Sequence, residues 1–192
     1  MKAITVATVA TFAALTFALN IWSFKIPFPL LSFLYYQIWE IPIVAAFLLY
    51  GPPLGAAVAV INTLLLLAYF PGALPTGPLY NLASVLSMFV GIYAAGKFFF
   101  RRSGRHREAI VILVSTILGI VSRVTIMTIV NWAFLRYPPP VGFMVPQETL
   151  ILWLPLIGFF NATLALYTIP VGYILAKAVS SGIKIKMWNS RS

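Results

Sequence analysis

Long apolar segments that are almost free of charge dominate this chain of 192 residues. Charged residues make up only 8% of it, whereas a soluble domain carries about 25%. The protein therefore cannot cover itself with side chains that water solvates, and its surface must face lipid. Backbone groups in lipid need internal hydrogen-bond partners. Because the apolar runs are long and lack the alternation typical of a β-barrel, they predict an all-α, polytopic membrane protein.

Six helices are expected, and each needs roughly 20 apolar residues to cross a membrane. They cover about residues 3–22, 36–50, 54–70, 79–100, 109–135 and 149–179. Residues 23–40, which contain two prolines and clustered aromatics, are expected to form a loop that dips toward the protein interior. No linker or internal repeat divides the sequence. We therefore expect one domain over residues 1–192, a bundle of six transmembrane helices.

The Lys and Arg residues lie mostly at the ends of the apolar segments, and their distribution predicts the orientation. With both termini in the cytoplasm, the basic residues near positions 97–107 and 177–191 lie inside, while Lys25 and Arg136 lie outside. This is the bias of a multi-pass protein of the cell membrane. It explains the net charge of +10 without a nucleic-acid partner. The outer connections 23–38 and 136–148 are rich in proline and aromatics, and we expect them to gate a site on that face.

Few residues here could carry catalysis or hold a metal. The chain has no Cys and no Asp; its acidic residues are Glu40, Glu108 and Glu148, and its one histidine is His106. Zinc and magnesium sites need several such ligands, and general acid–base catalysis usually needs a pair of them. The stretch GIYAAGKF lacks the Ser or Thr that completes a phosphate-binding loop. We therefore expect no enzyme activity, no metal and no cofactor.

Polar side chains within the apolar segments are the candidate binding residues. Arg123 is the costliest of them, so it should face the bundle interior with a partner; that partner is either Glu40 and backbone carbonyls or a bound polar group. The amides of Asn81, Asn131 and Asn161 can each donate and accept, which suits them to the edge of a heterocycle, although each could equally bond between helices. Their convergence on one cavity under the outer aromatics, near Trp39, would favour ligand binding.

The first helix carries small residues at a regular interval. Ala10, Ala14 and Ala18 are four positions apart and lie on one helical face. Small residues at this spacing let a second helix approach closely in lipid. The face could pack within the bundle or could dock a second membrane protein, and the spacing alone leaves both open.

Three stretches, WEIPIVAAFLLYGPPLGAAVAVINTLL, SRVTIMTIVNW and LPLIGFFNATLAL, resemble the substrate-binding S components of energy-coupling factor (ECF) vitamin transporters, most closely the riboflavin-specific members. The alanine-spaced first helix is similar to the motif with which that family docks its coupling subunit. The resemblance implies a six-helix bundle that captures a vitamin, riboflavin or a related flat heterocycle, from outside. It implies as partners a transmembrane coupling protein and two cytoplasmic ATPases.

Two positions depart from the pattern of the riboflavin members. Leu164 stands where those members have a ligand-contacting Lys, and Glu40 stands where an Asp usually precedes Ile-Pro. The resemblance makes Asn131 and Asn161 the main ligand-binding candidates, with Trp39, Glu40, Asn81 and Arg123 as further ones. The alternatives are a non-catalytic membrane subunit or passive carrier for another small molecule, and an intramembrane enzyme built on Glu40 and Arg123.

Overall fold

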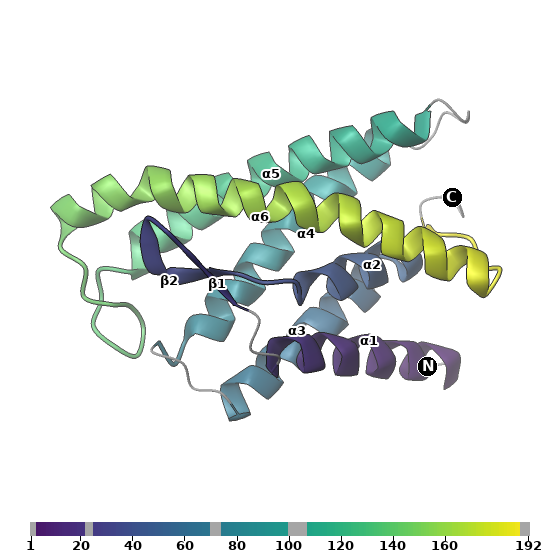
Figure 1. Ribbon diagram of the computed structural model, residues 1–192, viewed down its shortest axis with the longest axis horizontal. Coiled ribbons are helices and arrows are strands. Elements are labelled where there is room, and N and C mark those ends of the chain that lie inside the picture. The colour runs from purple at the N-terminus through teal and green to yellow at the C-terminus, as the bar shows by residue number, and fades with distance from the viewer. Residues whose placement is uncertain (1–2, 22–24, 70–73, 100–106, 189–192) are drawn as a thin grey trace.

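The computed structural model describes residues 3–21, 25–69, 74–99 and 107–188, and within these ranges it contains six helices and one β-hairpin (Figure 1). The elements, in chain order, are α1 (Ala3–Ile21), β1 (Ile26–Phe28), β2 (Leu31–Tyr36), α2 (Glu40–Tyr50), α3 (Pro52–Tyr69), α4 (Gly77–Phe99), α5 (Arg107–Phe134) and α6 (Gln147–Gly182). The mainly helical fold expected from the sequence is confirmed, with each helix near its expected position.

Four of the helices are long and apolar enough to cross a membrane. They are Pro52–Tyr69, Gly77–Lys97, Glu108–Phe134 and Gln147–Gly182. Two helices are not among them: α2 has 11 residues, and the apolar stretch of α1 is Val6–Ile21, which is shorter than a typical span. An 11-residue helix rises about 16 Å, roughly half the thickness of a hydrocarbon core. The expectation of six full spans is therefore not confirmed.

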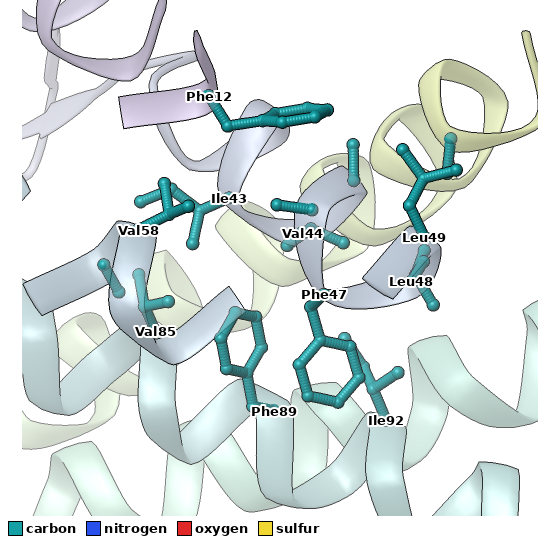
Figure 2. Packing of buried hydrophobic residues seen from close by; sticks show 14 of the residues in the cluster. Phe12, Ile43, Val44, Phe47, Leu48, Leu49, Val58, Val85, Phe89 and Ile92 are labelled. Carbon is teal, nitrogen blue, oxygen red and sulfur yellow. The ribbon is translucent and has the colours of Figure 1, made fainter. Parts of the chain in front are cut away.

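The short helix α2 forms the centre of the main core. Nine of its residues, Glu40 and eight apolar ones, are buried. Figure 2 shows Phe47 of α2 facing Phe89 of α4, and the two rings stack with centroids 4.3 Å apart. Val58 of α3 and Phe12 of α1 complete the packing around Ile43 and Val44 (Figure 2). A helix that is apolar on all sides is expected in such a position, because its neighbours shield it from both water and lipid.

A glycine joins α2 directly to α3. Gly51 has φ of +99° and donates its N–H to Phe47 O at 2.8 Å, which ends α2. Pro52 then begins α3, where a missing N–H costs no helical hydrogen bond. The segment after α6 returns to this turn, and Trp188 lies against Gly51 and stacks on Tyr93 at 5.8 Å. A side chain at position 51 would be strained by its backbone angle and would also meet the indole ring.

Part of the segment expected to be a loop is a β-hairpin, which corrects that expectation. Ile26 pairs with Tyr36 and Phe28 pairs with Leu31 in an antiparallel register. The expected start of the second helix near residue 36 is also wrong, because residues 31–36 are in a strand and α2 begins at Glu40. This stretch is rich in Leu, Phe and Tyr, and the aromatic residues favour strands that pack on a neighbouring surface.

The hairpin and the α5–α6 connection are both fixed to the helices. The ring of Phe28 lies 5.5 Å from that of Phe160 in α6, and Tyr167 donates its hydroxyl to Gln37 O at 2.6 Å. On the other side, Tyr80 of α4 donates to Val141 O at 2.8 Å, in the connection between α5 and α6. In Figure 1 this connection lies at the left, whereas α1 begins and α6 ends toward the right. The two connections therefore lie away from the end where α1 starts and α6 stops.

The closest approach of α4 to α5 depends on Gly91, and the variant Gly91→Ala tests it. A Cβ atom at this position would lie 2.1 Å from Leu118 O and 2.5 Å from Gly119 N, both backbone atoms. Because neither helix can move without disturbing its packing, we expect destabilisation of about 1–3 kcal/mol or more. The measurement is the thermal unfolding midpoint of the purified protein in detergent.

The matched control is Gly182→Ala near the end of α6, where a Cβ would meet no atom within 4 Å. It should be neutral or stabilising by about 0.5–1 kcal/mol, since Ala favours a helix more than Gly does. Equal unfolding midpoints for the two variants would contradict the close α4–α5 contact.

Candidate functional site

A cavity of about 870 Å³ lies beneath the hairpin, between α2, α4, α5 and α6. Its wall on α5 is a stripe of residues four positions apart, Arg123, Met127 and Asn131, and Leu135 continues this stripe just after the helix ends. From Arg123 to Asn131 the stripe extends about 12 Å along the helix. The volume lies within the range of about 300–1,000 Å³ that small-molecule sites occupy. The protein thus contains an elongated space large enough for a vitamin-sized molecule.

All six residues that the sequence suggested for substrate binding line this cavity. They come from the start of α2 and from α4, α5 and α6: Trp39, Glu40, Asn81, Arg123, Asn131 and Asn161. The spatial convergence expected for a binding site is therefore present. Whether each residue contacts a ligand stays a prediction.

Glu40 and Arg123 form a buried ion pair on the cavity wall. The guanidinium Nη1 lies 2.5 Å from Glu40 Oε2, and Nη2 lies 2.9 Å from Oε1. The two residues are only 3% and 1% exposed. Burial of two charges costs several kcal/mol each unless geometry and further hydrogen bonds compensate. Here two hydrogen bonds between the guanidinium and the carboxylate supply that geometry. The sequence left open which group pairs with Arg123, and the structure shows that it is Glu40.

Asn161 completes the set of partners around Arg123. Its Oδ1 accepts a hydrogen bond from Arg123 Nε at 3.0 Å, and its Nδ2 donates to Ile157 O at 2.9 Å. On α5, the Nδ2 of Asn131 donates to Met127 O at 2.6 Å. In both amides the nitrogen is therefore hydrogen-bonded to a backbone carbonyl of its own helix, and this restricts the atoms that can bind a ligand.

Aromatic side chains roof the cavity. Phe33 of β2 lies 5.5 Å from Phe143 of the α5–α6 connection and 5.4 Å from Trp153 of α6, measured between ring centroids. Phe33 and Phe143 line the cavity directly. The hairpin and the connection that were expected to gate the site therefore meet above it. At the rim, Lys25, Ser32, Tyr35 and Tyr69 line the cavity while remaining exposed.

Several lining residues were missed by sequence reasoning. Asn20, near the end of α1, donates to Thr16 O at 3.2 Å and to Asn62 Oδ1 at 2.7 Å. Asn62 itself does not line the cavity but holds Asn20 at its edge. An Asn in an apolar helix was the signal that could have identified Asn20. Gln37, Tyr80 and Ser84 also line the cavity, and their positions depend on the hairpin and on the tilt of α4, which the sequence did not specify.

Leu164 makes one part of the cavity wall apolar. It lies on α6 near Asn161 and Phe160, is 4% exposed, and lines the cavity. A lysine at this position would add a positive charge close to the Glu40–Arg123 pair. The buried wall instead has a closed ion pair, neutral amides and apolar groups.

The expectations on metal binding and on the first helix concern further residues in the described part of the chain. There, no group of three or more His, Cys, Asp and Glu side chains could hold a metal ion. His106 lies outside the described residues. On α1, Ala10, Ala14 and Ala18 are all exposed, whereas Phe12 and Ala13 pack into the core. The alanine face is therefore turned away from the bundle, which rules out packing within it.

Comparison with known proteins finds a similar fold. The structure matches the S component of a bacterial ECF transporter with a TM-score of 0.72, over 96% of this chain and 99% of that one, at 22% sequence identity. No family model matches the sequence, and no curated protein matches it. At this identity the likeness establishes a shared fold.

The buried ion pair should be essential to stability, and Glu40→Ala tests this. Removal of Glu40 leaves the Arg123 charge buried without its carboxylate, and loss of one partner of such a pair costs about 3–5 kcal/mol. We expect a large fall in the thermal unfolding midpoint in detergent.

Lys177→Ala is the matched control, because Lys177 pairs with Glu108 at 2.7 Å but its side chain is 57% exposed. Exposed pairs contribute about 0–1 kcal/mol, so this variant should unfold close to the wild type. Similar falls in the unfolding midpoint for both variants would mean that the buried Glu40–Arg123 pair stabilises the protein no more than an exposed pair does.

Proposed function

We propose that this protein is the membrane S component of an ECF-type importer and binds a vitamin, riboflavin or a related flat heterocycle, at the outer face. The observation that carries the proposal is the convergence of Asn81, Asn131, Asn161 and the Glu40–Arg123 pair on one cavity roofed by aromatic rings. The shared fold with an ECF S component supports the same function. In this function the chain is a transport subunit and not an enzyme.

The proposed topology places the cavity outside. Both termini are cytoplasmic, and the single domain of 192 residues crosses the cell membrane several times. This is consistent with Lys177, Lys184 and Lys186 near the end of α6 and with the cavity under the hairpin at the other end. The positive-inside bias then assigns the α6 end to the cytoplasm. The hairpin and the α5–α6 connection close over the bound molecule.

Flat aromatic ligands suit the lining. Trp39, Phe33, Phe143 and Phe160 offer ring faces and edges, and such contacts contribute about 0.5–1.5 kcal/mol each beyond burial. The amides supply the few polar contacts that orient a ligand in a mostly apolar site. Leu164 reduces the polar contacts available compared with the riboflavin members, which is why the proposal extends to related heterocycles.

Riboflavin binding is tested on protein purified from cells grown with the vitamin. We expect a flavin absorbance spectrum and a measurable affinity by titration. The Asn161→Ala variant should bind more weakly by about 1–3 kcal/mol, roughly 5- to 150-fold, because the hydrogen bond to the ligand is lost.

Thr168→Ala is the control, since Thr168 is buried on the same helix but does not line the cavity. It should bind as the wild type does. A colourless preparation without flavin affinity would exclude riboflavin, and a panel of other vitamins would then define the ligand.

The alanine face of α1 is proposed to dock the transmembrane coupling protein, which joins two cytoplasmic ATPases. Ala14→Leu places a bulky side chain on an exposed surface that needs close helix approach. We expect loss of co-purification of the coupling protein and the ATPases, with ligand affinity unchanged.

Ala68→Leu on α3 provides the control, because Ala68 is also exposed but lies outside the alanine face. It should retain every partner. If Ala14→Leu retains them too, the docking role of α1 is wrong, and the passive carrier without an ATPase module becomes the better description.

A further inference from the structure

The orientation of the Asn161 amide is set by the chemistry of its neighbours. A guanidinium group only donates hydrogen bonds, so the atom of Asn161 that lies 3.0 Å from Arg123 Nε must be the oxygen. A backbone carbonyl only accepts, so the atom 2.9 Å from Ile157 O must be the nitrogen. Both contacts require the same orientation. The amide therefore has its oxygen toward Arg123 and cannot rotate by 180° without losing two hydrogen bonds.

Glu40 holds Arg123 in the position that this orientation needs. The planar guanidinium meets both carboxylate oxygens through Nη1 and Nη2, and this leaves Nε for Asn161. Such two-pronged contacts fix direction as well as distance. The three residues come from α2, α5 and α6. They form a chain of contacts in which each side chain restricts the next.

Asn161 and Asn131 consequently offer opposite polarity to the cavity. One N–H of Asn161 Nδ2 meets no acceptor among the described residues and is left to donate to a ligand. A ligand donor is disfavoured at Asn161 Oδ1, because it would lie beside the positive guanidinium of Arg123. At Asn131 the nitrogen is bound to Met127 O. Its Oδ1 accepts no bond within the described ranges, and the residue lines the cavity, so this oxygen is left for a ligand donor. Arg123 and Asn131 lie two turns apart on α5, about 12 Å.

The charge at the depth of Asn161 is balanced. The carboxylate of Glu40 and the guanidinium of Arg123 compensate one another, and Leu164 adds an apolar surface beside them. An anionic or cationic ligand group here would be buried without an opposite charge, which is costly. The exposed Lys25 lies on the lining as well, but at the rim.

We propose that the Glu40–Arg123 pair is a positioning device that holds Asn161 as a hydrogen-bond donor, so that the site selects a neutral ligand with an acceptor, a ring carbonyl or ring nitrogen, at its inner end. A donor group on the same ligand, an N–H or a hydroxyl, meets Asn131 further out. This inference rests on the proposed function, since it assumes that the cavity is the ligand site. Arg123 and Glu40 act through Asn161 and are positioning residues.

The first test needs no ligand. In Arg123→Lys the positive charge near Glu40 is kept, but an ammonium group cannot reproduce the fork that reaches both Glu40 and Asn161. With asparagine labelled by ¹⁵N, the side-chain amide signals of Asn161 are assigned by their loss in Asn161→Asp. We expect them to shift and broaden in Arg123→Lys as the amide samples both orientations, with those of Asn131 unchanged. Asn161 signals identical to the wild type would overturn the positioning role.

The second test compares one chemical change at two sites, with riboflavin as the probe. Asn161→Asp keeps an oxygen for Arg123 but removes the donor, and should weaken binding by about 30-fold or more. Asn131→Asp keeps an oxygen toward the cavity but loses the hydrogen bond to Met127 O, and should weaken binding by about tenfold at most, less than Asn161→Asp does. Equal losses, or unaltered binding in Asn161→Asp, would overturn the selection of an acceptor.

The two tests separate this inference from the proposed ligand. If the wild type does not bind riboflavin, the riboflavin assignment fails, while the amide signals still decide whether Arg123 positions Asn161. The pair of Asp variants is then measured with the vitamin from the panel that the wild type binds, and the same inequality is expected.

Discussion

The ion pair between Glu40 and Arg123 is the interaction on which the rest of the site depends. Each charge would be costly alone at this depth, so neither residue is tolerable without the other. Their contact joins the start of α2 to the middle of α5, and Asn161 extends it to α6. The same contacts that satisfy the buried charges also fix the directions of the polar groups beside the cavity. The side chains of Glu40, Arg123 and Asn161 therefore contribute both to the stability of the fold and to the proposed recognition of the ligand.

The shortness of α2 makes this arrangement possible. With 11 residues it does not extend far beyond the core, and the chain before it is free to form the hairpin. Glu40 lies at the first turn of α2 and lines the cavity. Aromatic side chains then cover this space, through contacts of Phe33 with Phe143 and Trp153.

The two ends of the bundle serve different purposes in the proposed function. One end contains the cavity, the hairpin and the anchored α5–α6 connection, and its charged residues outside the buried ion pair include Lys25, Arg136 and Glu148. The other contains the Gly51 turn covered by Trp188, together with the lysines near the end of α6. The alanine face of α1 is exposed and does not line the cavity. Capture of a ligand and contact with a partner can thus involve separate surfaces.

Composition and the spacing of apolar runs were sufficient to predict the helices, because a lipid-facing chain can satisfy its backbone only in a few ways. Sequence also identified Arg123 and the amides, since a polar group in an apolar helix is costly and needs a reason. It did not predict the hairpin, because aromatic strand residues beside prolines also fit a loop. It missed Asn20 and left the partner of Arg123 open, since Glu40 and Arg123 are 83 residues apart. Only the tertiary structure, in which α2 and α5 both pack against α6, decided that contact and the direction of the Asn161 amide.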